Sequence, residues 1–163
     1  MTKYEEMCSS AHTAYKDWFE YQERSGRTMQ KFVFDFIAHC GIPADKLRYL
    51  RWNDVEQGYL EPDDGGKFTL FGAFKFDDDE QSWRLGISII LSQTQWVAFG
   101  LTLAELNDGK WMVKVAGDKS SRPFDTSDST QCNQLYDDIV TKISASYKTR
   151  KSTPERVIGF KTN

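Results

Sequence analysis

The first part of the chain carries apolar positions with helical spacing. Apolar or small side chains recur every three or four residues from position 4, which predicts a helix over roughly residues 2 to 24. The segment Ser25-Gly26-Arg27-Thr28 is typical of a break, and Thr28 is a suitable N-cap for a second helix that ends at Gly41. The first apolar face consists of Tyr4, Met7, Cys8, Ala11, Ala14, Tyr15, Trp18, Phe19 and Gln22, and the second of Met29, Phe32, Val33, Phe36, Ile37 and Cys40.

These two helices are expected to form an antiparallel hairpin, followed by a third, shorter helix. Pro43 suits a first helical position, and Leu47 and Leu50 have the spacing of one helix face up to about Trp52. The string EPDDGG at residues 61–66 marks a turn. The helical part is therefore assigned to residues 1–58.

Beyond residue 66 the apolar period changes from that of a helix to that of strands. Four strands are expected, over residues 67–76, 82–92, 96–106 and 110–116, so the sheet spans residues 67–116. The alternation and the loop lengths agree on an antiparallel meander, because opposed residues point to the same face. In this register Phe76 faces Trp83, Leu91 faces Val97, Ile89 faces Phe99, Leu103 faces Val113 and Leu101 faces Val115. One face of the sheet is strongly apolar and is the predicted core.

The opposite face of the predicted sheet mixes small residues with a few large apolar ones. Large exposed aromatic side chains are enriched in protein interfaces. The predicted partner-binding surface consists of Phe71, Ile90, Trp96, Met112 and, from outside the sheet, Trp52. The alternative is that a helix of the N-terminal hairpin covers this face and buries these side chains.

The C-terminal part predicts one more helix. Leu135, Tyr136 and Ile139 belong to an apolar stripe over residues 127–147, which is expected to pack on the core face of the sheet. Residues 148–163 form a basic tail or one late edge strand. The expected fold is a single α+β domain over residues 1–163, with an N-terminal helical hairpin, a four-stranded antiparallel meander and a C-terminal helix on the sheet.

Composition narrows the class of protein. A chain of 163 residues that is 39% hydrophobic and 28% charged suits one folded domain and excludes collagen-like and wholly disordered classes. The net charge is −3, and the tail from Lys148 holds five basic residues and one acid, so the body is acidic. Such a balance disfavours a dedicated nucleic-acid binder. No apolar segment approaches the roughly 20 residues that cross a bilayer, and three cysteines at no framework spacing favour the cytoplasm.

The strongest candidate for metal chemistry is a set of four side chains near the expected hairpin. Cys8 and His12 share one helix face, and His39 and Cys40 end the next helix, so an antiparallel hairpin would bring them level. Two thiolates and two imidazoles suit zinc. The alternative, which we favour, is that the cysteines pack as small hydrophobic residues, so no metal or cofactor is assigned.

Other segments give weaker indications. Residues 65–69 are not a phosphate loop, because the upstream glycine and the hydroxyl of that motif are missing. The acids at 77–80 are typical of a solvated hairpin tip. Arg48 and Arg51, in a string that alternates basic with apolar side chains, are the candidate nucleic-acid contacts together with the tail.

No catalytic constellation and no family motif is indicated. The sequence therefore favours a non-enzymatic cytoplasmic module that binds another protein, such as an inhibitor, an immunity-type protein or an adaptor, through the mixed sheet face and an acidic surface. Self-association through that face is an open alternative. A small-ligand or metal-dependent site between the sheet and the N-terminal helices, with catalysis left open, is the second interpretation, and nucleic-acid binding is the third. No membrane contact is expected.

Overall fold

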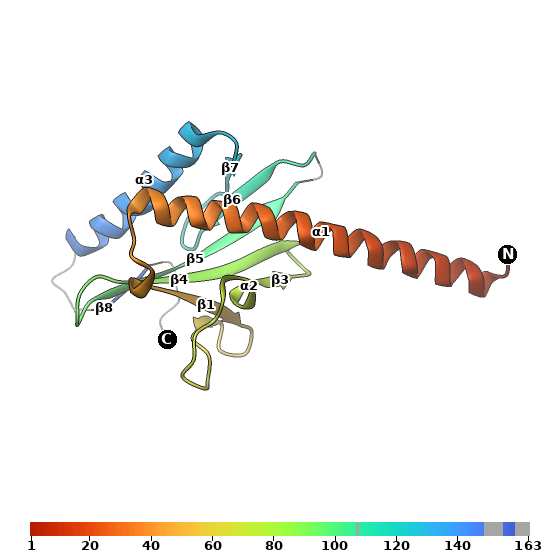
Figure 1. Ribbon diagram of the computed structural model, residues 1–163, viewed down its shortest axis with the longest axis horizontal. Coiled ribbons are helices and arrows are strands. Elements are labelled where there is room, and N and C mark those ends of the chain that lie inside the picture. The colour runs from red at the N-terminus through yellow and green to blue at the C-terminus, as the bar shows by residue number, and fades with distance from the viewer. Residues whose placement is uncertain (107, 149–154, 159–163) are drawn as a thin grey trace.

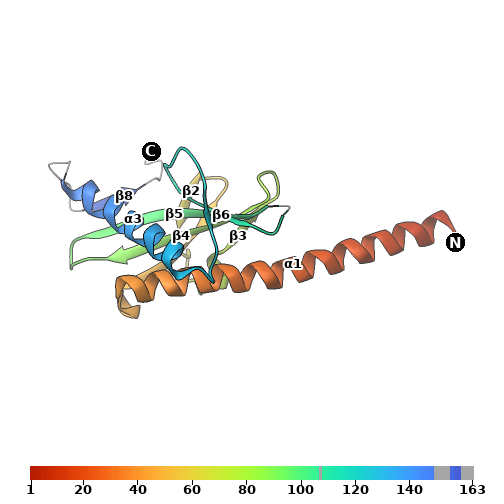
Figure 2. The ribbon, with the colours of Figure 1, turned by 90° about the horizontal axis from the view of Figure 1, so that it is seen from above.

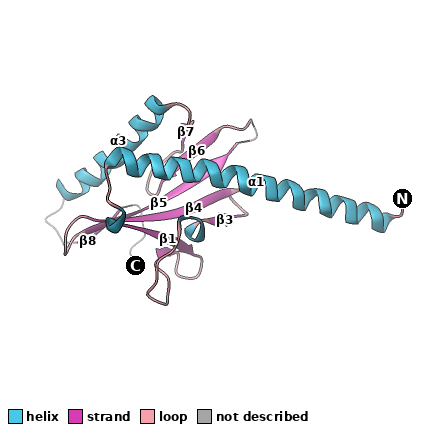
Figure 3. Ribbon diagram, in the orientation of Figure 1, coloured by secondary structure: helices cyan, strands magenta, loops and turns pink. Residues whose placement is uncertain are grey.

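The computed structural model describes residues 1–106, 108–148 and 155–158, and it has an α+β architecture (Figure 3). A long N-terminal helix precedes an antiparallel sheet, and a second long helix follows it. The helices are α1 (Lys3–Cys40), α2 (Leu70–Ala73) and α3 (Ser129–Lys148), with a 3₁₀ turn at Ala44–Lys46. The strands are β1 (Leu47–Asn53), β2 (Gly58–Leu60), β3 (Lys75–Asp77), β4 (Ser82–Ile90), β5 (Trp96–Glu105), β6 (Trp111–Val115), β7 (Arg122–Phe124) and β8 (Glu155–Ile158).

Helix α1 is one continuous helix, so the predicted helical hairpin is wrong. It begins with a capping box between Thr2 and Glu5, runs for 38 residues and ends at Gly41, which adopts the left-handed conformation as expected. At 1.5 Å per residue the helix is about 57 Å long. Only its C-terminal half lies on the sheet, and its N-terminal half projects beyond it (Figures 1 and 2).

The predicted break at residues 25–28 fails because its polar groups are satisfied inside the helix. The Ser25 hydroxyl donates to the carbonyl of Tyr21 at 2.7 Å, and the Thr28 hydroxyl donates to the carbonyl of Arg24 at 3.2 Å. These bonds leave the helical ladder intact. Gly26 costs a helix only about 1 kcal/mol relative to alanine, which the packing of the following residues offsets.

Strand β1 replaces the third predicted helix. Leu47 and Tyr49 face the core opposite Ile89 and Ile87 of β4, whereas Leu50 lies on the other face opposite Gly86. The segment therefore alternates with the period of a strand, and the ladder with β4 outweighs the helical spacing of its leucines. The helical part predicted for residues 1–58 accordingly ends at Cys40, apart from the 3₁₀ turn.

The first predicted strand, residues 67–76, is also largely wrong. The Thr69 hydroxyl accepts from the backbone N–H of Gly72 at 3.0 Å and caps the short helix α2. Only β3 remains as strand, and it pairs with the start of β4, where Phe76 lies opposite Trp83 as predicted. Phe71 consequently belongs to a helix and not to the sheet.

The centre of the sheet agrees with the prediction. Strands β3 to β7 follow one another as an antiparallel meander, and β1 and β2 extend it beyond β4. The register of β5 and β6 is as predicted, with Leu103 opposite Val113. Between β4 and β5 the register is shifted, because Val97 lies opposite Ile89 and not Leu91. The shift is an even number of residues, so every side chain keeps its predicted face.

The core lies between the sheet and two helices. Helix α3 follows the prediction closely, and it packs beside the C-terminal half of α1 on the apolar face (Figure 2). Tyr136 of α3 is buried, and its hydroxyl donates to the carbonyl of Phe32 at 3.2 Å. Among the described helices, none is both long enough and apolar enough to span a membrane.

The C-terminal tail is described only in part. Strand β8 pairs in parallel with the first residues of β5, from Trp96 to Phe99, so the alternative of one late strand is confirmed for residues 155–158. The remaining tail residues, 149–154 and 159–163, lie outside the described residues.

Candidate protein-interaction surfaces

The five residues predicted to bind a partner do not form one surface. Ile90 and Trp96 are opposed across β4 and β5, at one end of the second face of the sheet. Met112 lies on β6 opposite Ala104. Phe71 lies on α2 with 56% of its surface exposed, and the nearest atom of its ring would be 3.5 Å from a Cβ on Gly26 of α1. The expected grouping with Phe71 therefore fails, since that residue lies beside helix α1.

The second face of the sheet is covered at its centre by a tyrosine and not by a helix. The ring of Tyr59, from β2, lies directly over Gly86 and Gly100. A Cβ on Gly100 would stand 2.4 Å from that ring, so only glycine allows the contact. Burial raises the pKa of Tyr59 to about 12. The small residues noted in the sequence thus accommodate one aromatic side chain of the same chain.

Beside Tyr59 the second face contains a hollow of about 540 Å³. Its wall includes the ion pair between Arg48 and Glu61, whose Nη1 and Oε1 atoms are 3.3 Å apart. The side chains around it are Arg48, Leu50, Tyr59, Leu60, Glu61, Ser88, Ile90, Ser92, Gln93, Gln95 and Trp96. The second interpretation from the sequence placed a ligand site against the N-terminal helices, whereas this hollow lies on the opposite face.

A groove of about 700 Å³ does run along α1, where the helix passes α2 and β3. Phe71, Phe76 and Trp83 belong to its apolar side. Its basic groups are Arg27, Arg51 and Lys75. Arg51 also donates to the carbonyl of Gly72 at 3.0 Å. The groove therefore lies where the covered part of α1 passes into the projecting part.

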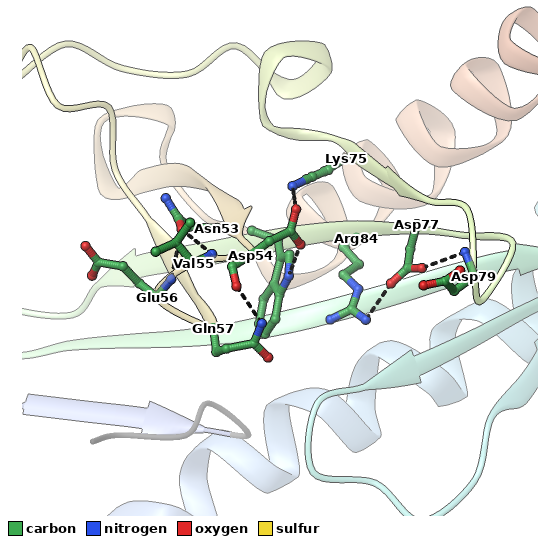
Figure 4. Close-up of polar contacts among 10 residues, drawn as sticks. Asn53, Asp54, Val55, Glu56, Gln57, Lys75, Asp77, Asp79 and Arg84 are labelled. Carbon is green, nitrogen blue, oxygen red and sulfur yellow. Dashed lines mark hydrogen bonds and ion pairs between the residues drawn. The ribbon is translucent and has the colours of Figure 1, made fainter.

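Two hairpin turns at the edge of the sheet have the same construction. Figure 4 shows the residues of the first turn and, from the second, Asp77 and Asp79. Asn53 accepts the backbone N–H groups of Val55 and Glu56 through its Oδ1 atom. In the other turn Asp77 accepts those of Asp79 and Glu80 in the same way. Each turn closes with a glutamine at positive φ, Gln57 and Gln81, whose side-chain amide donates to a carbonyl of the turn. The repeated letters [N/D]-D-x-E-Q are the signal of this shared turn, which the sequence analysis missed.

Arg84 connects these two turns. Its guanidinium lies 4.5 Å from the centre of the Trp52 ring, and Nη2 donates to Oδ2 of Asp77 at 2.7 Å. The backbone N–H of Glu80, and after it Arg84, lowers the pKa of Asp77. Trp52 is therefore held in a cation–π contact, which stabilises the edge of the sheet and limits the area that it offers to a partner.

Lys75 joins the same network, and its ammonium group pairs with the carboxylate of Asp54. This contact lowers the pKa of Asp54. The indole N–H of Trp52 donates to the same carboxylate at 3.0 Å. The acidic residues 77–80 form the hairpin turn between β3 and β4, as the sequence indicated.

The candidate zinc ligands do not converge. Because α1 is a single helix, His12 and His39 are separated by about 40 Å along its axis. His39 instead contacts Asp137 of α3, with Nε2 and Oδ1 2.7 Å apart. Among the described residues, no group of three or more histidine, cysteine or acidic side chains is placed to hold a metal ion.

The candidate nucleic-acid contacts are separated as well. Arg48 points to the second face of the sheet with its partner Glu61, and Arg51 donates to Gly72. The expected basic helix is a strand. Most of the basic tail lies outside the described residues.

A further exposed apolar surface lies on the projecting half of α1, and the sequence analysis did not expect it to be uncovered. We call this surface the N-terminal stripe. Tyr4 is 70% exposed, Met7 63%, Tyr15 68% and Phe19 52%. The stripe consists of Tyr4, Met7, Cys8, Ala11, Ala14, Tyr15, Trp18 and Phe19, and all of these residues are exposed.

The N-terminal stripe continues directly into the core. Tyr4, Cys8, Ala11, Tyr15 and Trp18 follow alternating intervals of four and three residues. The same intervals lead through Gln22 to Ser25, Met29, Phe32 and Phe36, the last four of which are buried. The transition occurs at Trp18, whose ring contacts Phe76 at 4.8 Å between centroids. The same helix face is therefore covered by the sheet in the C-terminal half of α1. In the N-terminal half, no part of the described chain covers it.

Comparisons with known proteins add no relative: the chain matches no protein-family model, no curated protein and no solved structure.

Proposed function

We propose that this protein is a non-enzymatic module that binds another protein through the N-terminal stripe. Inhibitors, immunity-type proteins and adaptors are the classes that fit such a role. The observation that supports the proposal is the exposure of four large apolar side chains on one face of a projecting helix. Contiguous apolar surface of this kind is typical of interaction sites in soluble proteins.

Helix energetics support the same proposal. About five helical turns project from the domain, and an isolated helix of that length is marginal in water. Most helical stability in proteins comes from packing of an amphipathic face. A partner that covers the N-terminal stripe would supply this packing, as the sheet does for the other half of α1.

The proposal moves the predicted binding surface from the sheet to the helix. Trp52 is stacked on Arg84, and Phe71 lies beside α1, so the mixed sheet face offers less continuous apolar area than expected. We retain the cytoplasm as the proposed location. The cysteines Cys8, Cys40 and Cys132 are free thiols, which fit a reducing compartment.

Site-specific photo-crosslinking in cells that produce the protein tests the proposed function. A benzophenone amino acid at position 15 lies on the stripe, and the same group at position 16 lies beside it on the polar side of the helix. We expect a protein adduct from position 15 and a much weaker one from position 16. Equal labelling at both positions, or none at position 15, would contradict the proposal.

A further inference from the structure

We propose that the protein covering the N-terminal stripe is a second copy of this chain, in an antiparallel helix pair centred on Ala11. This inference rests on the proposed function, because it names the partner of the same surface. A twofold pair is the commonest arrangement of soluble oligomers, and it requires a surface that is complementary to itself.

The sizes of the side chains along the stripe meet that requirement. Large side chains stand at both ends, Tyr4 and Met7 at one and Tyr15 and Trp18 at the other. The middle holds the small residues Cys8, Ala11 and Ala14. Two such helices can therefore approach closely at the centre, while large side chains pack against one another at each end.

Reversal about Ala11 gives a definite set of contacts. Tyr4 lies opposite Trp18 of the partner subunit, and Met7 lies opposite Tyr15 of the partner subunit. Cys8 lies opposite Ala14 of the partner subunit. Aromatic pairs and sulfur–aromatic contacts of this kind contribute beyond their buried area.

The position of the sheet selects the antiparallel orientation. The face of α1 that carries the stripe is the face that, from Ser25 onward, contacts the chain's own sheet. In a parallel pair the partner helix would run on into the space which that sheet occupies. In the antiparallel pair the partner helix ends near Trp18, and its domain lies beyond the free end of α1, where Figure 2 shows open space.

The buried area suits a reversible dimer. A large side chain of this kind covers about 150–250 Å² when it is fully buried. Full coverage of the exposed fractions of Tyr4, Met7, Tyr15, Trp18 and Phe19 would therefore bury roughly 400–700 Å² per chain. The pair would bury on the order of 1,000 Å², which is close to the lower limit of specific interfaces. We therefore expect an equilibrium that depends on protein concentration.

Analytical ultracentrifugation of the full chain tests the dimer. The wild type is expected to shift from 18.8 kDa towards twice that mass as the concentration rises. Ala11→Glu places two like charges at the centre of the pair and should keep the chain monomeric, with at least tenfold weaker association. Thr13→Glu is the matched control, because Thr13 is also exposed but lies on the opposite face of the helix, and it should dimerise like the wild type.

A charge-swap mixture separates lost contacts from lost folding. Ala11→Lys alone is also expected to be monomeric. An equimolar mixture of Ala11→Glu and Ala11→Lys should restore the dimer, because the opposite charges meet at the centre. A monomeric wild type at all concentrations, or equal effects of Ala11→Glu and Thr13→Glu, would overturn the inference.

Oxidative crosslinking tests the orientation. In the antiparallel pair the two Cys8 residues are offset by about 9 Å along the helix, beyond the roughly 7 Å that a disulfide allows between Cα atoms. A Cys8→Ser, Ala11→Cys variant should crosslink through position 11, and the wild type should not crosslink through Cys8. A disulfide between two Cys8 residues would overturn the antiparallel arrangement.

Photo-crosslinking at position 15 distinguishes this inference from the proposed function. An adduct with twice the chain mass supports both. An adduct with a different protein, together with a monomeric chain in the ultracentrifuge, overturns the second copy but leaves protein binding in place. The absence of any adduct contradicts the proposed function itself.

Discussion

The two halves of α1 have the same apolar spacing and opposite surroundings. From Ser25 to Cys40 the apolar face of α1 contacts the sheet and α3, and Phe32 and Phe36 are almost fully buried. From Lys3 to about Phe19 the same face is exposed, apart from the contacts of Trp18 with Phe76 and Trp83. Figure 1 shows both halves on one continuous helix, so the difference lies in what covers the face and not in the helix itself.

The comparison separates two kinds of information in a sequence. Periodicity states which side of a helix is apolar, and it does so equally well in both halves. It does not state which surface will cover that side, because the covering residues are distant in sequence or belong to another molecule. An apolar stripe without a cover inside its own chain therefore points to an interaction.

The largest expected difference is between two variants, each of which truncates one aromatic residue in one half of α1. Phe36→Ala removes a side chain that is 1% exposed, and we expect the free energy of unfolding to fall by about 3–5 kcal/mol. Tyr15→Ala should change it by less than about 0.5 kcal/mol in dilute solution, where no partner covers the stripe. Urea titrations followed by circular dichroism measure both values. Equal losses would show that the two halves do not differ as described.

A second prediction concerns the other covered surface of the domain. Gly100→Ala would place a Cβ 2.4 Å from the Tyr59 ring, and we expect a loss of about 1–3 kcal/mol in the free energy of unfolding. Gly58→Ala is the control, because its nearest neighbour would be 3.9 Å away, and it should be close to neutral. The cost of Gly100→Ala should shrink in a Tyr59→Ala background. Persistence of the full cost there would refute the contact.

The pH dependence of the free energy of unfolding tests whether the Tyr59 ring is covered. The pKa of Tyr59 is about 12 in the folded chain, above its ordinary value of 10.0, so the unfolded chain loses this proton first. The free energy of unfolding should therefore fall between pH 10 and pH 12, by up to about 1.4 kcal/mol per pH unit from this residue. Tyr59→Phe should show a slope shallower by about one proton. Identical slopes in wild type and variant would contradict the burial of Tyr59.

The smallest of the predicted contrasts concerns Gly26, near the junction of the two halves. A Cβ there would meet only the Phe71 ring, at 3.5 Å, so Gly26→Ala should stabilise the continuous helix by about 0.5–1 kcal/mol. Gly41→Ala, the same change at a φ of 64°, should destabilise because alanine disfavours that conformation. Thermal unfolding of both variants gives the two signs. A destabilising Gly26→Ala would favour a break in α1.

The parts of the fold that the sequence predicted are those in which local pattern and tertiary packing agree. Strands β4 to β6 and helix α3 alternate or repeat with one clear period, and Gly41 ends α1 as expected. The wrong elements carried competing signals. Ser25 and Gly26 indicated a turn, and Leu47 with Leu50 indicated a helix, yet helix hydrogen bonds and the ladder with β4 prevailed.

The candidate site was predicted less well than the fold. The residues of the N-terminal stripe were all recognised as one helix face. The erroneous break at residues 25–28, however, predicted a hairpin in which a second helix packs against the first. The coverage of Gly86 and Gly100 by Tyr59 depends on a strand that the sequence did not reveal. Both errors arise from contacts between distant residues, which spacing along the chain does not encode.

Amide hydrogen exchange across α1, measured at low and high concentrations of the wild-type chain, tests the central claim most directly. Residues 25–40 should be protected at both concentrations, because the sheet and α3 cover them. Residues 4–19 should exchange rapidly in dilute solution and become protected as the concentration rises. Rapid exchange of these residues at every concentration, with no partner added, would contradict the claim that a second copy covers the stripe.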